Sequence, residues 1–289
     1  MGVNAFASFD PGQIETLGSM MHYFAGGVGR PLLFLHGSPT SSYLWRNVAP
    51  SLAKSGRCIA VDLIGMGQSG KPAIEYRYSD HLRYLDAFCD SMGLTDCVLV
   101  THGWGAALGV DRARRVPGFA QKIVLIEPIR AFRAWEDFPP LAAETFRAFR
   151  SADRGREMVI DRNLFIEEVL PKTILRSLSA DEMEGYRAPF RQRADRMPLH
   201  RFACEVPIAG EPADVAERLS ANEKWLVDNL CPKLLLYARP GANMPPKDAL
   251  AYAASLGNCE AAFVGEALHQ VPEDCPAAIA AAIAEWLAR

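Results

Sequence analysis

The chain has 289 residues, about twice the length of a typical domain, although α/β sheets of this size often form a single domain. Nearly half of the residues are apolar (49%) and 22% are charged, so the composition predicts a folded protein with a large core and excludes a disordered chain. With 31 basic against 34 acidic residues, the net charge of -3 provides no field that would hold nucleic acid or an anionic membrane surface.

The seven cysteines are odd in number and contain no C-x-x-C pair. They therefore predict reduced, mostly buried thiols rather than a disulfide framework or a thiolate zinc site. The first residues lack the basic start and apolar run of a signal peptide, and no stretch reaches the roughly 18 apolar residues of a membrane span. We expect a cytoplasmic protein.

Short apolar runs that end in glycine, proline or polar residues recur along the chain, as in strands buried on both faces. Helical patterns lie between them, including residues 80–92 and 106–115. This alternation predicts a mostly parallel, doubly wound sheet with helices on both faces and functional groups at the carboxyl ends of strands. The predicted strands lie in PLLFLHGSP (31–39), RCIAVDLIG (57–65), CVLVTHGWG (97–105), KIVLIEP (122–128), KLLLYARPG (233–241) and, more weakly, AAFVGEALH (261–269).

The alternation stops between about Arg130 and Asp214, where helical patterns replace strands. We therefore predict an inserted helical cap at residues 131–213 and an α/β core made of residues 1–130 and 214–289. Helical patterns in the second half of the chain cover residues 141–150, 156–170, 179–190 and an alanine-rich C-terminal helix within 275–289 that would cover one face of the sheet.

The segment THGWGAALG (101–109) follows a predicted strand and opens a predicted helix. Its layout is that of a nucleophile elbow, a tight turn that lifts one side chain above the sheet beside backbone N–H groups. The nucleophile position falls on Gly103, which has no side chain. The residues therefore indicate an α/β-hydrolase fold whose attacking group is missing.

Six motifs keep one order along the chain: HGSPTSSYLWRN (36–47), DLIGMGQSGKP (62–72), HGWGAALG (102–109), LPKTILRSLSADEM (170–183), PIAGEP (207–212), and ALH followed by PED (267–274). Together they resemble the haloalkane dehalogenases over roughly residues 20–289. The acid after a strand, Glu127, resembles the subfamily that uses glutamate at this position.

In that family an aspartate on the elbow displaces halide from carbon and forms an alkyl-enzyme ester, which water activated by a histidine–carboxylate pair then hydrolyses. The resemblance implies that His269 is the general base, that Glu127 orients it, and that Trp104 donates to the leaving halide, with no metal or organic cofactor. The family's HDWG reads HGWG here, with Gly103 at the nucleophile, and its HGNP reads HGSP, with Ser38 at the second halide donor. The implied substrate is a small halogenated alkane and the products are alcohol and halide.

Gly103 is the more consequential departure, because glycine cannot form the ester, and the side chains of Thr101 and His102 are expected to point away from the attack position. The chain as given is therefore expected to be inactive or very weak. A substitution introduced to trap substrate and a gene that has drifted would both leave glycine here, and Ser38 would be a second sign of drift. Ser38 keeps a hydroxyl donor on a shorter side chain.

The proposed site residues also have ordinary structural explanations. His269 would be an exposed loop histidine, Glu127 a solvated carboxylate at a strand end, and Trp104 a core residue. The surrounding motifs favour the site roles for all three.

Three other polar residues are predicted to be structural. Asp62 is expected to hold the loop around Gly65, and His36 and His102 are expected to form hydrogen bonds beneath the elbow.

An apolar stripe in the predicted cap has two explanations that stay open, because such residues form a core in most proteins and line a dry substrate pocket in this family. Asn243, just after a strand, would narrow or wet that pocket. The pocket candidates are Phe138, Leu141, Phe146, Phe165 and Leu268.

Two other functions stay open. One is a non-catalytic relative in which Trp104 and Ser38 hold halide or a small apolar molecule. The other is cofactor-free chemistry by the His269–Glu127 pair, with Gly103 making room for a larger substrate or a water. Epoxide hydrolysis and serine esterase chemistry are disfavoured because they need aspartate or serine on the elbow. A monomer or small homo-oligomer is expected.

Overall fold

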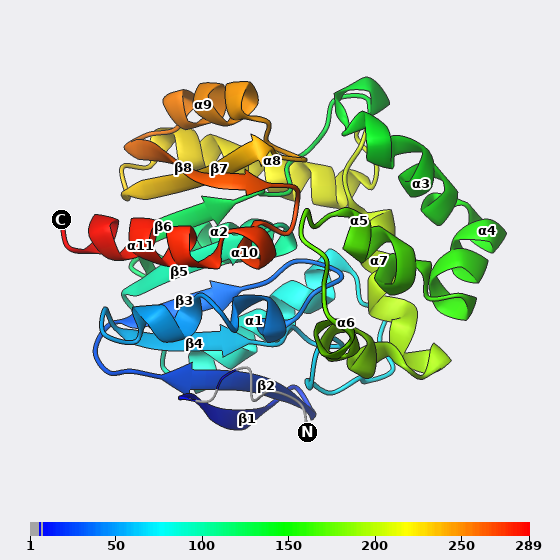
Figure 1. Ribbon diagram of the computed structural model, residues 1–289, viewed down its shortest axis with the longest axis horizontal. Helices are drawn as coiled ribbons and strands as arrows, with labels where there is room; N and C mark the ends of the chain where they lie inside the picture. Colours follow the sequence, from blue (N-terminus) through cyan, green and yellow to red (C-terminus); the bar gives the residue numbers. More distant parts are fainter. Residues whose placement is uncertain (1–5, 7) are drawn as a thin grey trace.

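One eight-stranded sheet organises the protein, and the computed structural model describes residue 6 and residues 8–289, apart from the side chain of Leu141. The strands are β1 (Asp10–Thr16), β2 (Ser19–Gly26), β3 (Pro31–Leu35), β4 (Arg57–Val61), β5 (Cys97–His102), β6 (Ala120–Ile126), β7 (Lys233–Pro240) and β8 (Cys259–Ala267). Their order in the sheet is β1-β2-β4-β3-β5-β6-β7-β8 (Figure 1). All neighbours from β4 to β8 pair in parallel, whereas β1 with β2 and β2 with β4 pair antiparallel.

The predicted fold class, a mostly parallel doubly wound sheet, is confirmed, and the six predicted strands are β3 to β8. The sequence analysis missed β1 and β2. Buried and exposed positions mix along β1 and part of β2, so neither strand forms the continuous apolar run that marks a strand buried on both faces.

Helices cover both faces of the sheet. Leu33 and Leu35 of β3 face one apolar cluster, and Leu32 and Phe34 face the other. The first cluster includes residues of α1 (Tyr78–Ser91), α2 (Trp104–Arg115), α8 (Ala213–Asp228) and α9 (Pro246–Ser255), and the second includes residues of α11 (Pro276–Leu287). Figure 1 shows α11 in front of the sheet.

Between β6 and α8 the chain is helical and lies at the end of the sheet where the parallel strands finish, on the right of Figure 1. The segment 156–170 is helical for most of its length, as its pattern predicts, but two π-helical turns and a break at residues 162–163 interrupt it. The proposed domain boundaries at 130/131 and 213/214 remain a prediction. The helices here are α3 (Pro140–Arg150), α4 (Ala152–Arg156), α5 (Leu170–Lys172), α6 (Ala180–Arg187) and α7 (Met197–Glu205).

All seven cysteines are free, as predicted. The expectation that most are buried is wrong, because only Cys58, Cys89 and Cys97 are buried and the other four are partly exposed. Burial raises the pKa of the Cys58 thiol to about 12, so this thiol stays protonated.

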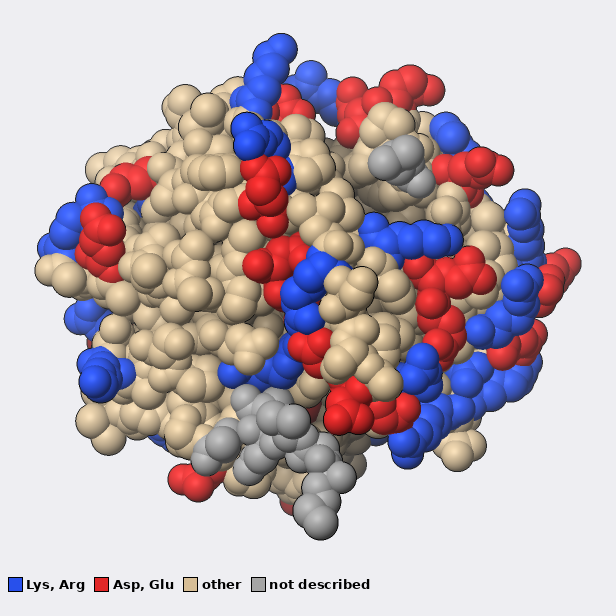
Figure 2. Space-filling view, in the orientation of Figure 1, with Lys and Arg blue, Asp and Glu red and all other residues tan. Residues whose placement is uncertain are grey.

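Charged side chains of both signs are interspersed over the helical segment in Figure 2. Several of them form ion pairs there, including Arg187 with Glu167 and Arg193 with Asp161. Within the described part of the chain, no helix is both long and apolar enough to span a membrane.

Candidate active site

The elbow is a sharp turn between β5 and α2. Gly103 has φ 55° and ψ -121°, and helix α2 begins at the next residue, Trp104. A Cβ at residue 103 would lie 3.5 Å from Cα of Gly37 and 3.7 Å from Nε2 of His269. There is thus room for a side chain that the sequence does not supply. Gly105 allows α2 to approach the end of β3, since a Cβ there would collide with the backbone of that strand.

His269 and Glu127 form a hydrogen-bonded pair above the elbow. Glu127 directly follows β6, His269 lies just after β8, and Nδ1 of His269 is 3.1 Å from Oε2 of Glu127. The buried Glu127 carboxylate also accepts the N–H of Asn243 at 2.6 Å and those of the residues on either side of Asn243. Because Nδ1 donates to this carboxylate, Nε2 is left to accept a proton on the side of Gly103.

A cavity of about 110 Å³ opens at Gly103, and its wall is mainly apolar. A second cavity, of about 530 Å³, shares wall residues with the first, among them Phe146 and His269. The predicted pocket residues Phe138, Phe146, Phe165 and Asn243 line the first cavity and Leu268 lines the second, whereas the side chain of Leu141 lies outside the described part of the structure.

Comparison with known proteins identifies the family. The family model of the α/β hydrolase fold matches residues 30–258. A haloalkane dehalogenase of Mesorhizobium japonicum is 47% identical over 278 residues, covering 95% of this chain and 90% of that protein. The structure of a haloalkane dehalogenase of Bradyrhizobium elkani superimposes with a TM-score of 0.95 at 45% identity, covering 97% of this chain and 98% of that one. The chain belongs to the haloalkane dehalogenase family.

A more distant member of this family has the same fold. The haloalkane dehalogenase of Agrobacterium tumefaciens is 33% identical and superimposes with a TM-score of 0.94 over 99% of both chains. The family assignment made from the sequence motifs is thus confirmed. By its family, the protein with Gly103 is a hydrolase.

The two candidate halide donors both line the first cavity. Trp104 is almost fully buried and packs against Tyr78 and Phe202, with ring centroids 5.8 and 5.4 Å away. The buried Oγ of Ser38 has no hydrogen-bond partner among the described residues. Both residues therefore border the space that a ligand would occupy.

Asp62 holds the loop after β4, as predicted. Its carboxylate accepts the N–H of Ser42 at 2.7 Å and that of Gln68 at 2.9 Å. It also lies 3.0 Å from Nδ1 of His22. The pKa of Asp62 is lowered because these hydrogen bonds and the nearby His22 outweigh the effect of burial.

His36 and His102 lie beneath the elbow, also as predicted. Nε2 of His36 accepts the N–H of Leu63 at 3.0 Å, and Nε2 of His102 donates to the carbonyl oxygen of His269 at 2.8 Å. Burial lowers the pKa of both imidazoles, so both are neutral near pH 7. His102 thereby fixes the backbone of His269.

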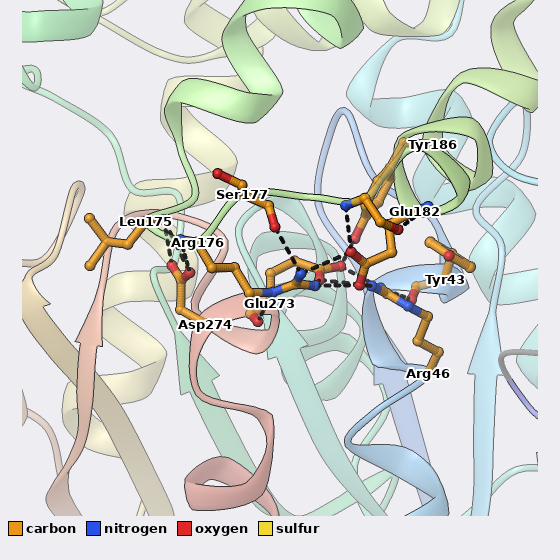
Figure 3. Close-up of polar contacts among 10 residues, drawn as sticks. Tyr43, Arg46, Leu175, Arg176, Ser177, Glu182, Tyr186, Glu273 and Asp274 are labelled. Carbon is orange, nitrogen blue, oxygen red and sulfur yellow. Dashed lines mark hydrogen bonds and ion pairs between the residues drawn. The ribbon is translucent and has the colours of Figure 1, made fainter. Parts of the chain in front are cut away.

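A buried polar cluster anchors the loop that carries His269 (Figure 3). Glu273, four residues beyond His269, is fully buried and accepts bonds from Arg46, Arg176 and the hydroxyl of Tyr186. Burial and the Glu273 carboxylate raise the pKa of the Tyr186 hydroxyl, which therefore remains a donor. We call Arg46, Arg176, Glu182, Tyr186 and Glu273 the anchor cluster.

The anchor cluster joins the helical segment to the sheet. Glu182 completes it, since it accepts from Arg46 at 3.0 Å and from Arg176 at 2.7 and 2.9 Å, and the bond from Arg176 lowers the pKa of Glu182 to about 2. Beside it, the Asp274 carboxylate accepts the N–H groups of Leu175 and Arg176 at 3.0–3.1 Å. The N–H of Gln270 donates to the carbonyl of Thr173 at 3.0 Å.

Sequence reasoning missed several residues of the site. Gln270, Thr173 and Phe202 line the first cavity, and two charged members of the anchor cluster, Arg46 and Glu273, are buried. Gln270 could have been suspected, because it is a polar residue directly after His269. The pairing of Arg46 with Glu273 has no sequence signal, since 227 positions separate them.

Proposed function

We propose that the cavity at Gly103 takes a small halogenated alkane and that the site is a haloalkane dehalogenase site that lacks its nucleophile and has serine at its second halide donor. One observation carries this proposal. Glu127 orients His269, and Nε2 of His269 lies 3.7 Å from the position that a Cβ of residue 103 would occupy. A carboxylate built from that point would enter the cavity beside a general base.

In this proposal the residues act in two stages. A carboxylate at position 103 would attack the carbon that bears the halogen, and the indole N–H of Trp104 and the Ser38 hydroxyl would hold the departing halide. His269 would then take a proton from water at Nε2 as that water attacks the ester, while Glu127 stabilises the imidazolium. A cytoplasmic location and a monomeric or small homo-oligomeric state remain predictions.

The chain as it stands is expected to release halide very slowly or not at all. Without an attacking carboxylate, water activated by His269 would have to displace halide from an alkyl carbon directly. Loss of a nucleophile lowers turnover by up to about 10⁶-fold in a well-studied hydrolase. The low rate of halide release that we expect is therefore attributed to Gly103.

The first test is halide release from a panel of short bromoalkanes by the chain and by Gly103→Asp. We expect Gly103→Asp to exceed the parent by at least roughly 10³-fold. Gly103→Ala is the matched control, because it imposes the same backbone strain without a carboxylate, and it should stay inactive. Equal rates for the Asp and Ala variants, both folded, would refute the proposal.

A second variant tests the order of the two stages. Gly103→Asp combined with His269→Ala should release about one halide per protein molecule and then stop, because the ester forms but is not hydrolysed. Intact-protein mass spectrometry should then show the added alkyl group. Halide release without a mass increase would contradict a covalent intermediate.

Binding without turnover is a second candidate, and the buried, unpartnered Ser38 hydroxyl beside Trp104 favours it. If the chain binds halide, bromide should quench tryptophan fluorescence with saturation. Trp104→Phe should remove the saturable part of the quenching. Quenching without turnover, even by Gly103→Asp, would make binding the better description.

A further inference from the structure

The space at Gly103 is open on the side of the reacting groups. The nearest atoms to a Cβ there are at 3.5 and 3.7 Å, which is ordinary van der Waals contact. The adjoining cavity of about 110 Å³ would hold roughly three or four water molecules at about 30 Å³ each. A group of a few heavy atoms therefore fits where the missing side chain would lie.

Unpartnered donors line this space. Gln270 is fully buried, and neither its amide nitrogen nor its amide oxygen has a partner among the described residues. The same holds for Oγ of Ser38. A buried polar group without a partner costs about 1–3 kcal/mol, so both side chains favour a polar occupant of the cavity.

The electrostatic surroundings favour an anion. Helix α2, 12 residues long, begins at Trp104, so its positive end points to the space beside Gly103. No acidic side chain is among the residues that line this cavity in the described structure. The nearby carboxylate of Glu127 pairs with Nδ1 of His269, not with Nε2, which faces Gly103. It also accepts three backbone N–H groups.

We propose that a small carboxylate from solution, formate in the first instance, binds in this space and acts as the nucleophile that Gly103 lacks. This inference rests on the proposed function. The carboxylate is held by the Gln270 amide and the N-terminal end of α2, while the Ser38 hydroxyl and Trp104 remain for the departing halide. Formate suits the space better than larger carboxylates, because the alkyl group of the substrate must occupy the same cavity.

The reaction balances with formate as a catalyst. One formate oxygen attacks the carbon that bears the halogen, a C–O bond forms, and the C–halogen bond breaks with its electron pair on the halide. Water then attacks the carbonyl carbon of the alkyl formate, and Nε2 of His269 takes its proton. The alkoxide leaves with that proton as the alcohol, and formic acid is returned to solution.

The test measures halide release from 1-bromobutane by the unaltered chain at increasing sodium formate, with ionic strength held constant by sodium sulfate. We expect a saturable rise of at least about tenfold, which corresponds to about 1.4 kcal/mol of barrier. Formate should exceed acetate, and acetate should exceed propionate. Formate labelled with ¹⁸O should transfer the label to the butanol, whereas direct attack by water would leave the butanol unlabelled.

Two variants act as controls. Gly103→Ala places a methyl group in the space and should abolish the formate dependence, with circular dichroism confirming that it is folded. His269→Ala should retain the first step, so butyl formate accumulates. A linear formate effect that Gly103→Ala keeps, or an unlabelled alcohol, would overturn the inference.

The outcome separates this inference from the function on which it rests. If Gly103→Asp turns over but formate has no effect on the parent, the carboxylate site is wrong and the proposed function stands. If neither Gly103→Asp nor formate produces halide, both proposals are wrong.

Discussion

The stability of the elbow provides a direct test of the backbone geometry. Gly103 has φ 55° and ψ -121°, a conformation that costs other residues about 1–3 kcal/mol. A methyl group adds no steric cost, because its nearest neighbour would be 3.5 Å away. Alanine also makes the unfolded chain less flexible than glycine does, which favours the folded protein by about 0.4–1 kcal/mol. At mid-range values of both effects, Gly103→Ala should therefore lose roughly 1.3 kcal/mol, and at most about 2.6 kcal/mol.

This loss of unfolding free energy can be measured as a fall in the melting temperature. At about 2.1 cal/mol/K per residue, a chain of 289 residues has an unfolding entropy of roughly 0.6 kcal/mol/K, so the melting temperature should fall by about 1–4 °C. Gly93→Ala is the control, because Gly93 has φ 62° and no neighbour within 4 Å of its Cβ position. It should lose about 1 kcal/mol without touching the cavity. An equal or higher melting temperature for Gly103→Ala would refute the strain argument.

Three further predictions concern buried polar groups. Glu127→Gln in the Gly103→Asp background should lower steady-state halide release, after the first halide, by roughly 10³–10⁴-fold, because the amide no longer fixes the His269 tautomer, and a comparable rate would contradict the orienting role. Glu273→Gln removes the buried carboxylate that pairs with Arg46 and leaves Arg46 only Glu182, so it should cost up to about 3–5 kcal/mol in the urea unfolding free energy, against about 1 kcal/mol or less for a surface ion pair. Burial lowers the pKa of His81 to about 3, below the roughly 6.5 expected when unfolded, so the unfolded chain binds the proton first and stability falls as the pH drops below about 6.5. His81→Phe should therefore show a smaller loss of urea midpoint between pH 8 and pH 5, and an unchanged loss would exclude His81 as a source.

The sequence was sufficient for the parallel part of the fold, because strands such as β3 are buried on both faces and stand out as apolar runs. It was insufficient for β1 and β2, where the strands are partly exposed. The helical pattern at 156–170 did not reveal the interruption there, because apolar periodicity does not distinguish an α-helix from one interrupted by π turns.

For the site, local motifs predicted which strand ends converge but not how charge is buried around them. His269 and Glu127 lie where strand-end reasoning placed them. The burial of Glu273 had no signal in the sequence, because its partner Arg46 lies 227 positions away. Contacts at such separation depend on the tertiary fold and leave no local pattern.

The bonds between Gln270 and Thr173, and between Asp274 and the Leu175–Arg176 backbone, have a mechanical consequence. The wall of the cavity near Thr173 and the loop that bears His269 form one connected unit, so neither moves without displacing the other. Helix α3 also contributes apolar side chains, those of Ala142 and Phe146, to the wall of the cavity. Passage of a ligand is thus expected on the α3 side, where side chains and helix shift without disturbing the base.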